Sequence, residues 1–274
     1  MEGRKATITI IGITSSTATV SGRRLSRRLF QIVSSVLVAL AGLACVTWGC
    51  AVLPIFLQGY NVQRIAPRII NGQSFDTKLI ESLLPPALEH DACQASVRTA
   101  EAMVRLRLFE TAVAQTERTA FSDTLRSLRE AVVDALRCSP TQPFLWFLRY
   151  WLETAENGFN SKSLRYLSMS YLTGPNEGWI SAKRNGFSLA IYDQLPEDLA
   201  AKVVPEFVSL VRSGFYSQAV ANLSGPGWPK REMLLSALAA VPEGRKYQFA
   251  RYLRAEGLYL DVPGVPPIDR RPWN

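Results

Sequence analysis

The stretch FLWFLRYWLETAENG, residues 144–158, decides the fold of the C-terminal part of this chain. Its first nine residues comprise two tryptophans, two phenylalanines, a tyrosine, three leucines and one charged side chain. Such a run is compatible with a membrane span, the wall of a substrate pocket, or one helix of a repeat stack. A span needs about 20 apolar residues. We exclude a span here because Arg149 interrupts the run and Glu153 and Glu156 end it.

Apolar residues within this stretch recur at the spacing of one helical face. They are Phe144, Phe147, Leu148, Trp151, Leu152 and Ala155. Trp146 and Tyr150 lie off this stripe, one helical turn apart. They make the helix apolar on two faces, which is what the middle of a stack of helices requires.

The helical period continues on both sides of the stretch. It recurs over residues 164–172 and 200–211, and strand-like alternation is scarce. Proline and glycine separate the periodic segments at helix-hairpin intervals: Pro140, Gly158, Gly174-Pro175, Pro196, Gly214 and Gly225-Pro226-Gly227. The sequence therefore predicts an all-α domain of helical hairpins over residues 85–260. Within it, Pro205 should kink or split the helix after Val204.

Residues 144–177 resemble a tetratricopeptide repeat, a pair of helices joined by a turn. Gly158 falls at the turn, and the second helix has small residues and a large apolar residue where the family has them. The positions that carry the resemblance are Ser163, Leu167, Ser170 and the closing Pro175. A looser match precedes it, and the resemblance covers residues 109–215. It implies a stack in which each hairpin buries its apolar face against its neighbours.

One position departs from the tetratricopeptide pattern. The family prefers Gly or Ala in the first helix where this chain has Trp151. We therefore expect the helices to pack more widely at this point than in other members of the family.

A second apolar run, LFQIVSSVLVALAGLACVTWGCAVLPIFLQ, occupies residues 29–58. It is long enough to cross a bilayer as a helix. Six of the 31 basic residues but only one of the 23 acidic residues precede Gln58, so this short N-terminal part carries +5 of the net charge of +8. The basic pI therefore reflects an N-terminal cluster, and we expect no nucleic-acid partner.

The basic cluster also predicts the orientation of the span. By the positive-inside rule, residues 1–28 form a cytoplasmic arm and the remainder lies outside the cytoplasm. We expect an uncleaved signal anchor in an inner (cytoplasmic) membrane. A cleaved signal peptide, with Ala39-Leu40-Ala41 as its cleavage site, is an alternative. A long buried core helix is another. Residues 59–84 are expected to be a linker, and residues 261–274 a proline-rich tail that is packed, disordered or bound to a partner.

The four cysteines fit this topology. Cys45 and Cys50 lie within the span, whereas Cys93 and Cys138 lie in the part expected in an oxidising compartment. If residues 91–118 and 123–137 form antiparallel helices, Cys93 and Cys138 meet at one end of the hairpin. The sequence allows either a disulfide between them or two separate buried thiols.

Candidate catalytic groups are few. His90 is the only histidine, and no nucleophile motif, phosphate-binding loop or metal-ligand spacing accompanies it. The carboxylate pairs Glu153 with Glu156 and Glu197 with Asp198 are expected to be solvated or to cap helices. The pair Lys183-Arg184 is expected to be solvated surface. The sequence predicts no cofactor, no metal and no small-molecule substrate.

These observations favour a membrane-anchored helical-repeat scaffold that binds another protein, with the bilayer contacted by residues 29–58. By analogy, such a domain suits a cell-envelope assembly such as polysaccharide synthesis or export. Trp146, Arg149, Tyr150 and Tyr166 are the candidates for contact with a partner, and core packing is the favoured role for them. Two further readings remain: a structural subunit of a membrane complex that uses Gly42 and Gly49 in the bilayer, and an enzyme with a helical active-site cleft.

Overall fold

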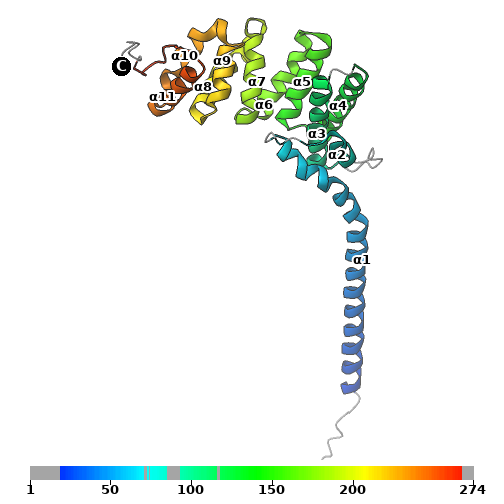
Figure 1. The fold of residues 1–274 in the computed structure, drawn as a ribbon. Coiled ribbons are helices and arrows are strands. Elements are labelled where there is room, and N and C mark those ends of the chain that lie inside the picture. Colours follow the sequence, from blue (N-terminus) through cyan, green and yellow to red (C-terminus); the bar gives the residue numbers. More distant parts are fainter. Residues whose placement is uncertain (1–18, 71–72, 74, 85–92, 116–117, 267–274) are drawn as a thin grey trace, which may run out of the picture. The chain divides into compact units, whose positions relative to one another are not determined.

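The structure is a computed structural model that describes residues 19–70, 73, 75–84, 93–115 and 118–266. The described residues form helices joined by turns, with no strand among them (Figure 1). The chain divides into two compact units, Met1–Tyr60 and Asn61–Asn274. The prediction of an all-α fold with one N-terminal apolar helix is thus confirmed.

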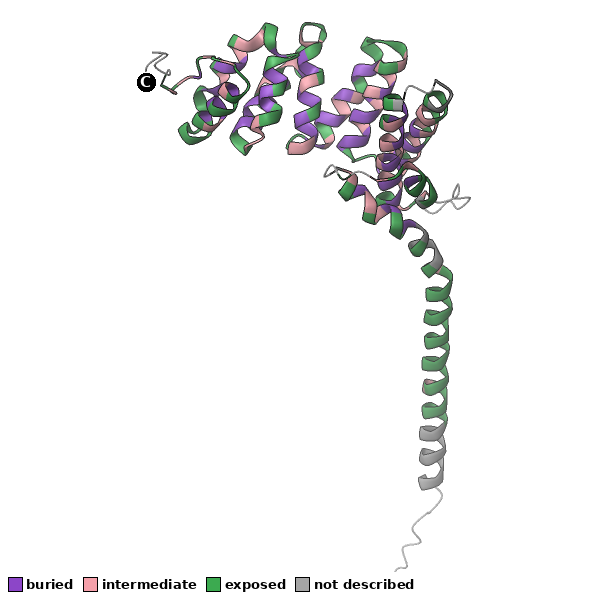
Figure 2. Cartoon of the chain, in the orientation of Figure 1, coloured by how far each residue is buried: buried purple, intermediate pink, exposed green. Residues whose placement is uncertain are grey.

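Helix α1, Thr19–Ile70, carries the apolar run. Its segment Leu29–Leu53 has 25 residues and a mean hydropathy of 2.3, and it is the one described helix long and apolar enough to cross a bilayer. None of its most apolar window is buried within the protein, as the exposed colouring of this helix shows (Figure 2). It is therefore not a core helix, because a core helix would bury one of its faces.

The end of α1 belongs to the second unit. Residues 59–84, expected to be a linker, contain this end and the short helix α2, Thr77–Leu83. Val62 and Ala66 of α1 are buried in a cluster with Ile80 of α2. Helix α2 begins at Asp76, whose side chain accepts a hydrogen bond from the Lys78 backbone N–H at 2.9 Å. The end of α1 and helix α2 form here because their apolar residues pack against each other and against α3 (Ala95–Gln115).

The remaining helices follow one another as hairpins. They are α3 (Ala95–Gln115), α4 (Arg118–Cys138), α5 (Pro143–Asn157), α6 (Leu164–Thr173), α7 (Gly178–Ala190), α8 (Glu197–Ser213), α9 (Tyr216–Ser224), α10 (Arg231–Ala237) and α11 (Glu243–Ala255). Within the pairs α3–α4, α5–α6 and α7–α8 the two helices contact each other. Helix α7 also contacts α5 and α9, and α9 contacts α11, so the hairpins stack in chain order (Figure 1).

The stretch FLWFLRYWLETAENG, predicted to be the first helix of a repeat and the turn after it, lies in α5 and its C-cap. It ends at Gly158, whose φ of 72° is a backbone conformation that favours glycine. In α6 and the turn before it, Ser163, Leu167 and Ser170 are buried at 2%, 0% and 0% exposure. Helix α8 continues through Pro205, so the expected split after Val204 does not occur.

Two apolar clusters fill the stack, one from α3 to α8 and one from α7 to α11 (Figure 2). Of the predicted tail, Val262 is buried in the second cluster. Residues 1–18 of the predicted arm and residues 267–274 of the tail lie outside the described residues, whereas residues 19–28 are helical.

Candidate functional site

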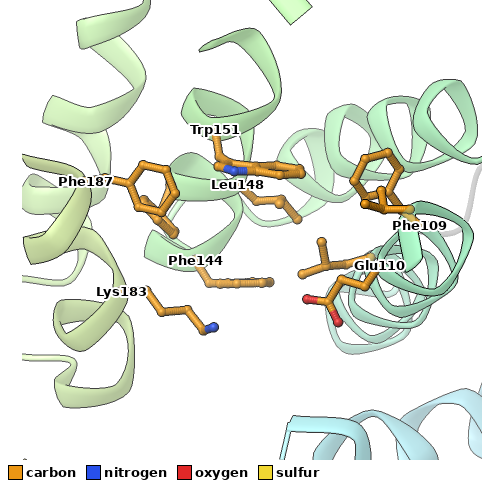
Figure 3. A pocket seen from close by; sticks show the side chains of 10 residues that line it. Phe109, Glu110, Phe144, Leu148, Trp151, Lys183 and Phe187 are labelled. Carbon is orange, nitrogen blue, oxygen red and sulfur yellow. The ribbon is translucent and has the colours of Figure 1, made fainter. Parts of the chain in front are cut away.

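An open, mostly apolar pocket lies where α3, α5 and α7 meet (Figure 3). Its volume is about 380 Å³, within the range of pockets that hold ligands or partner side chains. The lining residues are Leu106, Phe109, Glu110 and Val113 of α3, Phe144, Phe147, Leu148 and Trp151 of α5, and Lys183 and Phe187 of α7. On α3 and α5 these residues follow the spacing i, i+3, i+4, i+7, and on α7 they are four positions apart, which places them on one face of each helix.

Aromatic side chains form most of the wall. The Trp151 indole meets Phe109 edge-on with ring centroids 5.6 Å apart, and Phe147 meets Phe187 in the same way at 5.4 Å. Trp151 therefore lies in the wall of the pocket, between Phe109 of α3 and the other aromatic residues of α5.

The pocket has a buried floor and an exposed rim. Phe144 and Leu148 on the floor are 5% and 3% exposed, whereas Val113 and Phe187 on the rim are 49% and 40% exposed. Exposed apolar side chains around a concave apolar surface are typical of interaction sites. The rim residues can therefore contact a partner without any rearrangement of the core.

Two ionisable side chains line the pocket, Glu110 and Lys183 (Figure 3). Glu110 Oε2 forms an ion pair with Arg107 at 3.1 Å. Lys183 is exposed and makes no hydrogen bond or ion pair with another described residue. Of the described residues that line the pocket, Lys183 is therefore the one whose charge has no partner.

Three of the four candidates for contact with a partner lie together, Trp146 and Arg149 on α5 and Tyr166 on α6. The rings of Trp146 and Tyr166 are stacked, with centroids 6.2 Å apart and an interplanar angle of 16°. The guanidinium groups of Arg149 and Arg165 lie 5.4 and 4.6 Å from the Tyr166 ring centroid. Trp146 also donates from Nε1 to the Pro140 carbonyl at 2.7 Å. We call Trp146, Arg149, Arg165 and Tyr166 the aromatic–arginine cluster.

The arginines also alter the acidity of Tyr166. Arg165 donates to the phenol oxygen at 2.7 Å. Burial acts to raise the pKa of Tyr166, but hydrogen bonds and positive charge from Arg165 and Arg149 outweigh it and lower the pKa below the usual value.

Tyr150, the fourth candidate, is core. It is 1% exposed and belongs to the apolar cluster that spans α3 to α8. Burial raises the pKa of its phenol. Because no partner can reach a side chain at that exposure, Tyr150 takes the packing role that the sequence favours.

The carboxylates considered for catalysis do not gather in the pocket. Glu156 pairs with Arg129, Glu153 pairs with Arg149, and Glu197 and Asp198 are exposed in the first turn of α8. His90 lies outside the described residues. Among the described residues no group of three or more His, Cys, Asp or Glu side chains is arranged to hold a metal ion. Among the described residues, the pocket is an apolar surface lined by two charged side chains, of which Glu110 is paired and Lys183 is not.

Cys93 and Cys138 form a disulfide, with Cα atoms 5.3 Å apart. Cys93 lies just before α3 and Cys138 is the last residue of α4, so the bond closes one end of this hairpin. Cys45 and Cys50 of α1 are free and exposed. Gly42 and Gly49 have no neighbouring atoms within 4 Å of an added Cβ, so their helix face is open.

The sequence does not predict the pocket residues of α3 and α7, and it predicts that Lys183 and Arg184 are both solvated. The signal in the sequence for this site is Trp151, a large side chain where the resemblance predicts a small one. Comparison of the chain with protein-family models, curated proteins and solved structures finds no match.

Proposed function

We propose that this protein is a membrane-anchored scaffold whose helical domain lies outside the cytoplasm and binds a segment of another protein in the pocket between α3, α5 and α7. The observation that carries the proposal is the pocket itself, an open concave surface lined by five large aromatic rings. Aromatic side chains in a desolvated pocket are the usual energetic centre of a protein interface. A tetratricopeptide-like stack is the architecture that this proposal assumes.

Two observations support the topology. Six basic residues and one acidic residue precede the apolar segment Leu29–Leu53, and the positive-inside rule places such a flank in the cytoplasm. The Cys93–Cys138 disulfide, on the C-terminal side, is a bond that persists in oxidising compartments.

Site-specific photocrosslinking in cells tests the proposal. A photoreactive benzoylphenylalanine replaces Phe187 or Val113 on the rim of the pocket. The matched control replaces Leu172 of α6, which is apolar and 72% exposed but does not line the pocket. We expect protein adducts from Phe187 and Val113, no adduct from Leu172, and loss of the Phe187 adduct when V113D is added.

Adducts of equal yield from all three positions, or adducts with lipid alone, would refute a protein-binding pocket. Circular dichroism of each variant confirms that the helical domain is folded, and rim positions with this exposure tolerate replacement because they contribute little to the core.

A further inference from the structure

We infer that the segment bound in the pocket carries a large apolar side chain and, one helical turn away, a carboxylate that pairs with Lys183. This inference rests on the proposed function and adds the chemistry of the partner. It follows from the geometry of α7 and from the charges on the rim.

Helix α7 presents an apolar and a charged group to the same side of the pocket. Lys183 and Phe187 are four residues apart, so their Cβ atoms are about 5–6 Å apart on one helix face. Both line the pocket (Figure 3). A partner side chain that contacts Phe187 therefore places its neighbours on that side within reach of Lys183.

The charge balance of the rim selects a carboxylate. Arg107 neutralises Glu110, and no described residue neutralises Lys183. A basic partner residue would be repelled by Lys183 and would have to compete with Arg107 for Glu110. An acidic residue meets no uncompensated negative charge among the residues that line the pocket. Complementary charge of this kind sets specificity and register more than it sets affinity.

The neighbouring arginine does not compete for that carboxylate. Arg184 is 0% exposed, and its Nε donates to Glu206 Oε1 at 3.0 Å in the interior. Of the two adjacent basic residues, Arg184 is buried and paired with Glu206, whereas Lys183 is exposed and can pair with a partner. The charge that a partner meets on this face of α7 is therefore that of Lys183.

The relative weight of the two contacts is predictable. Burial of a large apolar side chain supplies most of the affinity, and its truncation should weaken binding by about tenfold or more. An exposed ion pair at a rim contributes less, and its loss should weaken binding by at most about fivefold. Added salt should remove the second contribution and leave the first.

Selection of random peptides displayed on phage against the full chain in nanodiscs of zwitterionic lipid tests the inference. Parallel selections use K183E, which reverses the rim charge, V113D, which makes the rim polar, and L172D as an exposed control outside the pocket. We expect wild type and L172D to enrich peptides with a large apolar residue and an Asp or Glu within four positions. K183E should enrich Lys or Arg in place of the acid.

Each other outcome decides a different claim. In one outcome, apolar peptides bind wild type but not V113D, and wild type and K183E select the same charges. This outcome would overturn the inference that the partner carries a carboxylate, and it would leave the proposed function standing. Peptides that bind V113D as well as wild type, or no enrichment at all, overturn the proposed function. A stoichiometric lipid that co-purifies with wild type and is lost from V113D assigns the pocket to an amphiphile and overturns both.

Discussion

The Arg184 guanidinium and the Glu206 carboxylate form an ion pair from which solvent is excluded. Arg184 Nε donates to Glu206 Oε1 at 3.0 Å, and the two side chains are 0% and 4% exposed. Tyr171 lies against the pair, with its ring centroid 3.9 Å from the guanidinium carbon, and its phenol donates to Glu206 Oε2 at 2.8 Å. Burial, followed by the negative charge of Glu206, raises the pKa of Tyr171, so the phenol remains a donor.

The ion pair lies within the hairpin of α7 and α8, with Arg184 on α7 and Glu206 on α8, and Tyr171 of α6 links it to the preceding hairpin. Arg184 also donates to the carbonyl oxygens of Ser170 at 2.6 Å and Gly174 at 3.1 Å, at the end of α6. The Ser170 carbonyl also accepts a hydrogen bond from the Gly174 backbone N–H at 3.2 Å, so Arg184 adds a second donor to it. The guanidinium therefore contacts the end of α6 while it pairs with Glu206 of α8.

Replacement of Glu206 by Gln should destabilise the helical domain by about 3–5 kcal/mol, because it leaves the buried Arg184 charge without a counter-ion. The double variant R184M/E206M should be more stable than E206Q, because it removes both charges together. Chemical unfolding of the full chain, followed by circular dichroism, measures the change.

The exposed pair Asp193–Lys230 is the control for this experiment. Asp193 has 77% of its side chain exposed. D193N should change the free energy of unfolding by at most about 1 kcal/mol. Equal effects of E206Q and D193N would show that the buried pair does not stabilise the helical domain.

Removal of the Cys93–Cys138 disulfide should lower the stability of the helical domain. The two residues are 45 positions apart, and closure of a loop of that length contributes up to about 4 kcal/mol in a chain-entropy description. Unfolding of C93S/C138S is compared with that of C45S/C50S, which removes the two cysteines that are free. We expect the first variant to unfold at lower denaturant concentration and the second to match wild type. If wild type is insensitive to reductant, the bond does not stabilise the domain.

The orientation of the membrane segment makes a separate prediction. A reporter that is active only outside the cytoplasm should be active when it is fused after Asn274, because the basic residues hold the N-terminal side in the cytoplasm. Replacement of Arg23, Arg24, Arg27 and Arg28 by Gln should reduce that activity. The same reporter fused before Met1 is the control and should be inactive. The reverse pattern would contradict the proposed topology.

The helical period and the membrane segment could be predicted from the sequence because both depend on short-range composition. The period of Phe144, Phe147, Leu148 and Trp151 is a property of one helix, and so is the apolar length of Leu29–Leu53. Within the predicted linker, residues 59–84, Val62 and Ala66 indicate packing only once α2 and α3 supply a surface for them to cover.

The pocket and the buried ion pair could not be predicted because they depend on which helices become neighbours. Lys183 and Arg184 are adjacent in sequence, yet one lines the pocket and the other is fully buried. Adjacent side chains point about 100° apart around a helix, so the environment of Lys183 does not predict the environment of Arg184. The sequence left Tyr150 open between a partner and the core for the same reason, since its spacing from Trp146 does not reveal which residues cover it.

The aromatic–arginine cluster makes the last prediction, which concerns pH. The pKa of Tyr166 is lowered by Arg165 and Arg149, whereas burial raises those of Tyr150 and Tyr171. On alkaline titration Tyr166 should therefore ionise before Tyr150 and Tyr171. The pKa of Tyr166 is lower in the folded state than the value of about 10 in the unfolded state, so its ionisation stabilises the folded state. This stabilisation is fully present at a pH above the unfolded-state pKa and is lost as the pH falls through the folded-state pKa.

The measurement is the difference in phenolate absorbance between wild type and Y166F as the pH is raised. The midpoint of this difference should lie below 10, the usual value for tyrosine. It should rise in R165Q, because that variant removes the guanidinium that donates to the phenol oxygen at 2.7 Å. R126Q is the control, since Arg126 pairs with Asp123 on α4. It should leave the midpoint unchanged. A midpoint that is the same in wild type and R165Q would mean that Arg165 does not act on the phenol in solution.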